Sequence, residues 1–268
     1  MTDHYYVIGN PVAHSKSPAI HAAFAAQTGQ DLAYARCLAP LDGFGATVRR
    51  LQAEGARGAN VTVPFKQEAF ALADSLSARA RLAGAVNTLV FADGRIHGDN
   101  TDGAGLVRDI EANAGLRLAG ARLLLLGAGG AARGVLGPLF DAGVGELVLA
   151  NRTLATAAAL AADFGGRPRV CAFAEVDGSF DLVVNATAAS LQAAVPPIPD
   201  TVFRSGTLAL DMMYGKEPTV FLQFAAQHGA RIRDGLGMLV EQAAEAFYVW
   251  RGVRPDSGPV LAALRGEC

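Results

Sequence analysis

Lys66 is one of few lysines in a chain whose basic residues are mostly arginines. The sequence contains twenty arginines and three lysines, and Lys66 closes the segment NVTVPFK. An ammonium is a compact charge whose pKa can fall on burial and which can give up a proton, whereas a guanidinium stays protonated. An ammonium can therefore neutralise and protonate an oxygen that gains negative charge during a reaction. Lys66 is a candidate proton donor, and the alternative is a surface lysine after a proline turn.

Hydroxyl, amide and carboxyl groups accompany this lysine in the first part of the chain. Asn60 and Thr62 occupy alternate positions of one expected strand, so their side chains share a face. Asp102 opens a helix in HGDNTDGAG, and Ser17 precedes a proline at another helix start, so each has an alternative role as a helix N-cap. A helix start with two free hydroxyls, here Ser15 and Ser17, also suits a carboxylate ligand.

A glycine-rich turn in LLLLGAGGAARG indicates a dinucleotide site. Gly127, Gly129 and Ala132 follow an apolar strand and open a helix, which is the order of a Rossmann fingerprint. The first glycine permits the tight turn, the second lets the backbone approach a pyrophosphate, and the alanine permits close helix packing. The free N–H groups at the helix start, including those of Gly130 and Ala131, would hold the phosphates.

The next strand indicates which dinucleotide is bound. It ends at Asn151-Arg152-Thr153, where a protein that binds NAD usually places an acid on the ribose 2'-hydroxyl. Arg152 can instead pair with a 2'-phosphate and stack on adenine, which favours NADP over NAD. The alternatives are an exposed cation at Arg152 and a helix N-cap at Thr153.

The elements that position these residues alternate between short aliphatic strands and alanine-rich helices, which is typical of βαβ units. We predict an α/β fold with mostly parallel sheet and two domains: a Rossmann-like domain over 104–236, and a βαβ substrate-binding domain from 1–103 plus 237–268. The segment VNTLVFADGRIHGD predicts a hairpin that turns at Asp93-Gly94. Further strands are expected over 5–8, 33–38, 59–63, 122–126, 146–150, 181–185 and 207–211, and helices over 18–28, 44–54, 154–164, 219–228 and 235–252.

Composition excludes several classes of protein. The net charge of −2 and the scattered cations argue against nucleic-acid binding. Three distant cysteines suggest neither a disulfide framework nor a metal site, and they fit a reducing cytoplasm. The longest apolar run is about ten residues, short of the roughly 20 that span a bilayer. We expect a soluble, cytoplasmic protein without a metal, either a monomer or a homodimer.

Nine motifs in order resemble the shikimate dehydrogenase family over essentially the whole chain. They are GNPVAHSKSP, NVTVPFK, GAVNTL, DNTDG, GAGGAAR, NRT, NAT, DMMY and GLGMLVEQA. The resemblance implies a two-domain enzyme that reduces 3-dehydroshikimate to shikimate with NADPH, in aromatic amino-acid biosynthesis. It implies that Lys66 and Asp102 are the catalytic pair, and that Ser15 and Ser17 hold the substrate carboxylate. Other implied substrate contacts are Asn60, Thr62, Asn87, Tyr214 and Gln242, and the implied contacts of NADP(H) are Asn151, Arg152 and Thr153 at the 2'-phosphate and Ala186, Thr187, Met212, Gly235 and Met238 near the nicotinamide.

Two positions depart from the family pattern. A second basic residue commonly follows NRT, and here that place holds Thr156, which weakens the preference for NADP. The family commonly reads NATxxG, whereas this chain has Ser190 in place of the glycine.

Two alternative functions remain open: an NAD-dependent quinate/shikimate dehydrogenase, and a non-catalytic protein that senses NADP(H). The paired serines argue against the first, and retention of both Lys66 and Asp102 argues against the second.

Overall fold

The computed structural model describes residues 2–266 and divides them into two compact units. Unit 1 comprises residues 2–105 and 240–266, and unit 2 comprises residues 106–239. The chain passes from unit 1 to unit 2 within α5 (Asp102–Arg108) and returns within α9 (Leu236–Arg251). Within this described part, each helix falls short of the length and apolar character needed to cross a membrane.

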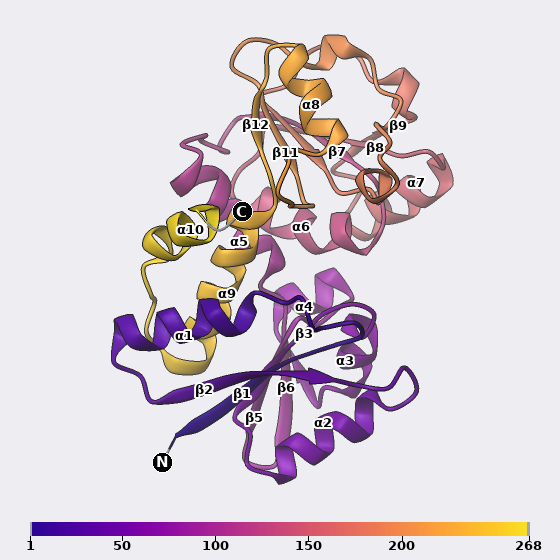
Figure 1. The fold of residues 1–268 in the computed structure, drawn as a ribbon. Coiled ribbons are helices and arrows are strands. Elements are labelled where there is room, and N and C mark those ends of the chain that lie inside the picture. Colours follow the sequence, from indigo (N-terminus) through magenta and orange to yellow (C-terminus); the bar gives the residue numbers. More distant parts are fainter. Residues whose placement is uncertain (1, 267–268) are drawn as a thin grey trace. The chain divides into compact units, whose positions relative to one another are not determined.

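Unit 1 is built on a six-stranded sheet in the order β2-β1-β3-β5-β6-β4 (Figure 1). The strands β2, β1 and β3 are parallel, so their carboxyl ends meet at one edge of the sheet. The strands β5 and β6 form the expected antiparallel hairpin, and its turn has positive φ at both Asp93 (51°) and Gly94 (73°). The strands are β1 (Asp3–Gly9), β2 (Leu32–Leu38), β3 (Gly58–Val61), β4 (Ser75–Leu76), β5 (Thr88–Ala92) and β6 (Arg95–Asp99).

Helices pack on this sheet and bury its aliphatic side chains. Phe44, Phe65 and Leu89 are among the residues fully enclosed in the core of unit 1. The sequence did not predict α3, β4 or α4, because elements of two to seven residues are too short to show a hydrophobic period. The helices are α1 (Ser17–Thr28), α2 (Phe44–Ala53), α3 (Lys66–Leu72), α4 (Ala78–Ala83) and α10 (Ser257–Gly266), with the first residues of α5 and most of α9.

Unit 2 is a doubly wound sheet in the order β12-β11-β10-β7-β8-β9, and all of its strands are parallel (Figure 1). This order matches the Rossmann arrangement, in which the connections reverse direction between the first and fourth strands, here β7 and β10. The strands are β7 (Arg122–Leu126), β8 (Glu146–Ala150), β9 (Arg169–Cys171), β10 (Leu182–Asn185), β11 (Leu208–Asp211) and β12 (Arg231–Arg233). The main helices are α6 (Gly130–Asp141), α7 (Leu154–Asp163) and α8 (Val220–Gln227).

The central strand of unit 2, β7, is apolar throughout because both of its faces are buried. Leu123 and Leu125 lie in one hydrophobic core, whereas Leu124 and Leu126 lie in the other. Successive side chains of a strand point to opposite faces, and both faces of a doubly wound sheet are covered by helices. The run LLLL therefore fixes β7 at the centre of the sheet and brings the glycine turn to its carboxyl end.

Candidate functional site

The loops that follow β1, β2 and β3 are joined to one another in unit 1. The backbone N–H of Asn10 donates to the carbonyl of Val63 (3.1 Å), and the side-chain amide of Asn10 donates to the carbonyl of Ala39 (2.9 Å). A Cβ on Gly9 would lie 2.4 Å from Cγ2 of Thr62, so only glycine lets these loops approach so closely. The segments that lead to the two serines and to the lysine therefore begin at the same edge of the sheet, where α/β proteins usually bind ligands.

The two predicted carboxylate readers lie at the start of α1. The helix begins at Ser17, and the cap position is Lys16 without a side-chain capping bond, so the expectation of a Ser17 cap is wrong by one residue. The N–H of Ser17 donates to Oγ of Ser15 (3.3 Å), and Arg36 donates to the Ser15 carbonyl through Nη2 (2.6 Å). The sequence did not single out Arg36, because its bond to Ser15 depends on the pairing of β1 with β2.

Lys66 and Asp102 form an ion pair. Lys66 begins α3, Asp102 begins α5, and Nζ of the lysine lies 2.6 Å from Oδ2 of the carboxylate. The side chains retain 32% and 20% exposure, so the pair is partly sheltered and still open to a ligand. The ammonium has three donors, and Asp102 engages one of them here.

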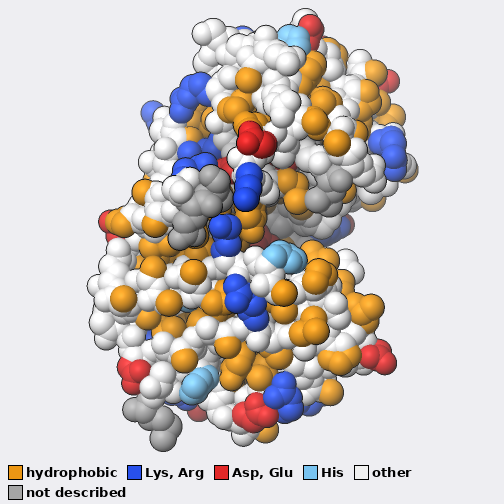
Figure 2. Space-filling view, in the orientation of Figure 1, with side chains coloured by type: hydrophobic (Ala, Val, Ile, Leu, Met, Phe, Trp, Pro, Cys, Tyr) orange, Lys and Arg blue, Asp and Glu red, His pale blue; other side chains and the backbone are white. Residues whose placement is uncertain are grey.

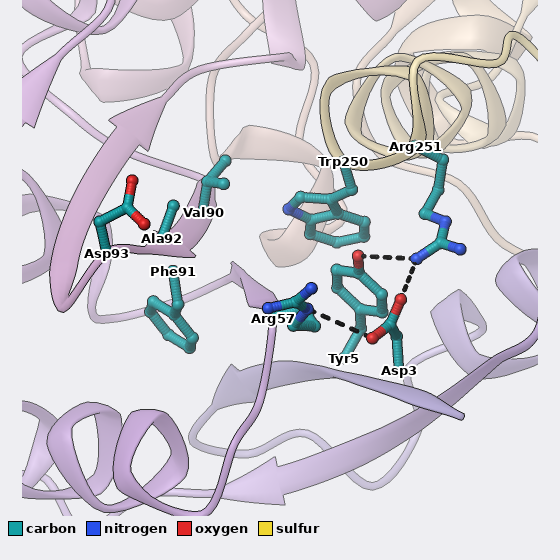
Figure 3. A pocket seen from close by; sticks show the side chains of 9 residues that line it. All are labelled: Asp3, Tyr5, Arg57, Val90, Phe91, Ala92, Asp93, Trp250 and Arg251. Atoms are coloured by element: carbon teal, nitrogen blue, oxygen red, sulfur yellow. Dashed lines mark hydrogen bonds and ion pairs between the residues drawn. The ribbon is translucent and has the colours of Figure 1, made fainter. Parts of the chain in front are cut away.

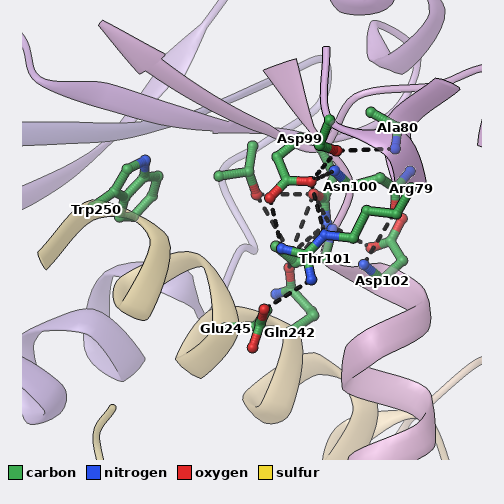
Figure 4. Close-up of polar contacts among 12 residues, drawn as sticks. Arg79, Ala80, Asp99, Asn100, Thr101, Asp102, Gln242, Glu245 and Trp250 are labelled. Atoms are coloured by element: carbon green, nitrogen blue, oxygen red, sulfur yellow. Dashed lines mark hydrogen bonds and ion pairs between the residues drawn. The ribbon is translucent and has the colours of Figure 1, made fainter. Parts of the chain in front are cut away.

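Asn87 fixes the other oxygen of this carboxylate. Its side-chain oxygen accepts the backbone N–H of Thr101 (2.8 Å), which sets the orientation of the amide. Its nitrogen then donates to Oδ1 of Asp102 (2.8 Å) and to Oε1 of Gln242 (3.2 Å). The backbone N–H of Asp102 in turn donates to the side-chain oxygen of Asn100 (3.1 Å). The carboxylate is thus held on both oxygens. Figure 4 labels Asn100, Thr101, Asp102 and Gln242 of this network.

Asn60 joins the same network from β3. Its amide nitrogen donates to the carbonyl of Asn87 (3.2 Å) and to Oγ1 of Thr88 (3.1 Å), while its oxygen accepts from the Tyr34 hydroxyl (2.7 Å). Tyr34 stacks on the buried ring of His21, with ring centroids 4.2 Å apart. Thr88, Thr101 and Tyr34 are not predicted from the sequence as members of this network. Thr101 could have been found from its place beside Asp102, whereas Tyr34 gives no local signal.

Arg79 forms ion pairs with residues of β6 and α9, two elements that carry this network. It donates from Nη2 to Oδ2 of Asp99 (2.6 Å) and from Nη1 to Oε1 of Glu245 (2.8 Å), and Figure 4 shows both bonds. Burial opposes ionisation of Asp99, but the hydrogen bonds from Arg79 and Ser77 outweigh it and hold the pKa of Asp99 below its ordinary value. Burial likewise opposes ionisation of Glu245, but the hydrogen bond from Arg79 helps to hold the pKa of Glu245 below its ordinary value. Arg79 thereby links the end of β6 to α9.

The glycine turn of unit 2 has the features that its sequence predicts. Gly127 has φ of 101°, and a Cβ there would lie 3.0 Å from Cγ2 of Thr187. A Cβ on Gly129 or Gly130 would meet nothing within 4 Å, so the backbone faces open space at the start of α6. The cap residue of α6 is Gly129, which has no side chain to occupy the first N–H groups of the helix, and Ala132 is fully buried. Free N–H groups beside open space form a cradle that fits a pyrophosphate.

The segment after β8 presents a cation to solvent. Arg152 is exposed, and Thr153 occupies the cap position of α7 without a side-chain capping bond. Asn151 donates from its side chain to the carbonyl of Thr153 (2.9 Å), which orders the turn. Thr156 is also exposed and adds no charge.

The residues predicted near the nicotinamide lie after β10, after β11 and at the start of α9. Ala186 and Thr187 contact Gly127, and a Cβ on Gly235 would lie 2.1 Å from the carbonyl oxygen of Met212. Met212 and Met238 both pack on one hydrophobic core of unit 2. Tyr214 follows Met212 in the loop after β11. The structure therefore gathers these residues at the carboxyl ends of the parallel strands, the usual ligand-binding edge.

A separate hollow of 340 Å³ lies in unit 1, and Figure 3 shows its lining. Arg251 hydrogen-bonds Asp3 and lies 3.5 Å from the Tyr5 hydroxyl, while Arg57 pairs with the same aspartate at 3.2 Å. The hollow lies at the start of β1, whereas the serines and the lysine follow the ends of β1 and β3. It is therefore distinct from the candidate site.

The visible face of each unit carries basic, acidic and apolar side chains interspersed (Figure 2). The described residues contain no group of three or more His, Cys, Asp or Glu side chains that could hold a metal ion.

Comparisons with known proteins give one family across the chain. Residues 7–89 match the family model described as shikimate dehydrogenase substrate binding domain, residues 110–194 match shikimate / quinate 5-dehydrogenase, and residues 235–265 match shikimate 5'-dehydrogenase C-terminal domain. The shikimate dehydrogenase (NADP(+)) of Herminiimonas arsenicoxydans is 62% identical over 100% of this chain and 98% of its own length.

Two solved structures share the fold over nearly the full length. An Ael1 enzyme from Pseudomonas putida has a TM-score of 0.95 and 52% identity, with 98% of each chain covered. The shikimate 5-dehydrogenase of Thermus thermophilus, in complex with NADP(H) and shikimate, has a TM-score of 0.88 and 36% identity, with 100% of each chain covered.

Proposed function

The chain belongs to the NADP-dependent shikimate dehydrogenase family, and we propose that it reduces 3-dehydroshikimate to shikimate with NADPH, using Lys66 and Asp102 for the proton chemistry. The observation that carries the proposal is the 2.6 Å pair between Nζ of Lys66 and Oδ2 of Asp102. An oriented ammonium that is partly open to solvent suits a ketone oxygen that gains negative charge.

The residues of unit 2 fit NADP(H). The start of α6, with Gly129 and Gly130 facing open space, would hold the pyrophosphate, and Arg152 would hold the 2'-phosphate. When bound, NADPH supplies the hydride. The residues after β10 and β11, including Thr187 and Met212, would position the nicotinamide half.

The polar network of unit 1 would position the substrate and its proton. Lys66 donates a proton to the carbonyl oxygen as negative charge grows on it, and Asp102 orients the ammonium through Oδ2. Asn87 holds Asp102 through Oδ1 and is itself bonded to Gln242, and we infer that both amides also contact the substrate. We infer that Ser15 and Ser17 receive the substrate carboxylate at the start of α1.

The activity is tested by mixing the full-length protein with shikimate and NADP, and by following the absorbance of the reduced nicotinamide. We expect turnover with shikimate and NADP that exceeds turnover with quinate or with NAD, because Arg152 suits a 2'-phosphate. Faster oxidation of quinate with NAD would identify the polyol-oxidising alternative instead. Absence of signal over many enzyme equivalents would contradict the proposed activity and favour a protein that senses NADP(H).

Arg152→Ala is expected to narrow the preference for NADPH over NADH. Loss of one charge-assisted contact to the 2'-phosphate should reduce kcat/KM for NADPH about tenfold, with little change for NADH, which lacks that phosphate. Steady-state kinetics with both cofactors measure the ratio. Arg167→Ala is a matched control, because Arg167 lies after α7 with its guanidinium over the ring of Phe140. An equal loss with NADPH and NADH in Arg152→Ala would contradict the 2'-phosphate assignment.

A further inference from the structure

Two neighbouring strands of unit 2 end in buried polar residues whose side chains hold the following turns. Asn185 ends β10, Asp211 ends β11, they pair in register, and neither is exposed. The side-chain oxygen of Asn185 accepts the backbone N–H of Thr187 (3.1 Å), and Oδ1 of Asp211 accepts the backbone N–H of Met213 (3.0 Å). Each side chain therefore sets the course of the backbone two residues later.

Ser190 joins these two turns. Its hydroxyl donates to Oδ2 of Asp211 (2.5 Å) and accepts from the amide nitrogen of Asn185 (3.1 Å). Asn185 and Thr219 donate to the same carboxylate oxygen at 3.2 and 2.6 Å. A buried carboxylate needs hydrogen bonds to offset its lost hydration, and Ser190 supplies one that also reaches the neighbouring turn.

The backbone at this position does not need a glycine. Ser190 lies in a short 3-10 helix over Ala189–Gln192, and the residue with left-handed backbone in this loop is Ala193, with φ of 51°. A side chain at position 190 therefore costs no backbone strain, and it is free to contribute a hydroxyl.

Both turns pack closely against glycines, with no room for a Cβ at either glycine. Thr187 lies against Gly127 of the dinucleotide fingerprint, since a Cβ on that glycine would lie 3.0 Å from its Cγ2. The carbonyl of Met212 lies against Gly235, since a Cβ there would lie only 2.1 Å from it. A change in the bonds around Ser190 would therefore be transmitted to the residues that line the dinucleotide site.

We propose that Ser190 is a positioning residue for the dinucleotide: through Asn185 and Asp211, its hydroxyl holds Thr187 and Met212 in the arrangement that binds the nicotinamide half of NADP(H). This inference rests on the proposed function. Ser190 acts on the cofactor through its neighbours, so its loss lowers affinity for the dinucleotide and leaves the groups of unit 1 unchanged.

The test compares Ser190→Ala with Thr219→Val in the full-length protein. Both changes remove one hydroxyl from the same oxygen of Asp211, but Thr219 caps α8 and has no bond to Asn185. We expect Ser190→Ala to raise the Kd for NADPH, measured by nicotinamide fluorescence, about tenfold, with the KM for 3-dehydroshikimate within about twofold of the parent value. Thr219→Val should lower Tm at least as much and leave the Kd for NADPH within about twofold.

Two further variants at position 190 test whether the hydroxyl itself sets the Kd for NADPH. Ser190→Thr keeps the hydroxyl and should restore the Kd, whereas Ser190→Gly should behave like Ser190→Ala. An unchanged Kd in Ser190→Ala, or an equal rise in Thr219→Val, would overturn the role of Ser190. If the parent protein binds NADPH without reducing 3-dehydroshikimate, the proposed function fails, while the binding measurements still decide the role of Ser190.

Discussion

Lys66→Ala should lower kcat by roughly 100-fold or more and change the KM for 3-dehydroshikimate much less, because a proton donor acts in the transition state more than in the ground state. Lys66→Arg should lose nearly as much, since a guanidinium keeps the charge but does not release a proton at neutral pH. Steady-state kinetics in both directions measure these losses, and binding of NADPH provides a check that each variant remains folded.

A neighbouring residue supplies the control for the lysine. Glu68 is exposed in the first turn of α3, the helix that Lys66 begins, so Glu68→Gln removes a charge at the same helix end. Its kcat should stay within about twofold of the parent value, as expected for a surface change. Near-normal turnover in Lys66→Arg would show that charge alone suffices, and the proton-donor role would then be wrong.

Arg79→Met should destabilise unit 1 by about 2 to 3 kcal/mol at pH 7, because it removes the shared partner of two mostly buried carboxylates. The side chains of Asp99 and Glu245 are 7% and 15% exposed, and Arg79 lies between them. We place the cost below most of the range for buried pairs because Arg79 is partly exposed and Glu245 keeps its bond to Arg254. Urea unfolding measures the free energy.

The pH dependence identifies the electrostatic origin of this loss. Asp99 and Glu245 have lowered pKa values in the folded protein, so the stability they contribute is present above their ordinary values and is lost as pH falls through the lowered ones. The difference between the parent and Arg79→Met should therefore be largest at pH 7 and shrink as pH falls below about 4. Arg81→Met on the exposed face of α4 should change stability by less than about 0.5 kcal/mol. A stability difference between the parent and Arg79→Met that stays constant with pH would contradict the ionic account.

The fold could be predicted from local patterns because its signals are local. The turn residues Asp93-Gly94, the glycines at 127 and 129 and the apolar run before them each require a particular backbone or burial, whatever the rest of the chain does. The βαβ repeats of unit 2 predict a mostly parallel sheet, whereas the order of its strands comes from the structure. The short elements α3, β4 and α4 lack such signals, so the sequence placed Lys66 after a proline turn without placing it at a helix start.

The site could be predicted only where its residues have a chemical signature of their own. An ammonium, a carboxylate and a glycine turn can be recognised in sequence, and the first two form an ion pair. The contacts of Tyr34 with Asn60 and of Arg79 with Glu245 join residues that are 26 and 166 positions apart. Only the completed packing of sheet and helices brings such pairs together, and nothing in the local sequence distinguishes these residues from ordinary core or surface positions.

The backbone N–H of Thr101 fixes how Asp102 meets Lys66 in the proposed catalytic pair. A main-chain amide can only donate, so its bond to Asn87 forces the nitrogen of that side chain toward Oδ1 of Asp102, where it too can only donate. Oδ1 therefore accepts from Asn87, while Oδ2 accepts from Nζ of Lys66. In the proposed reaction, this arrangement makes the aspartate an electrostatic anchor that keeps the ammonium of Lys66 in a fixed orientation.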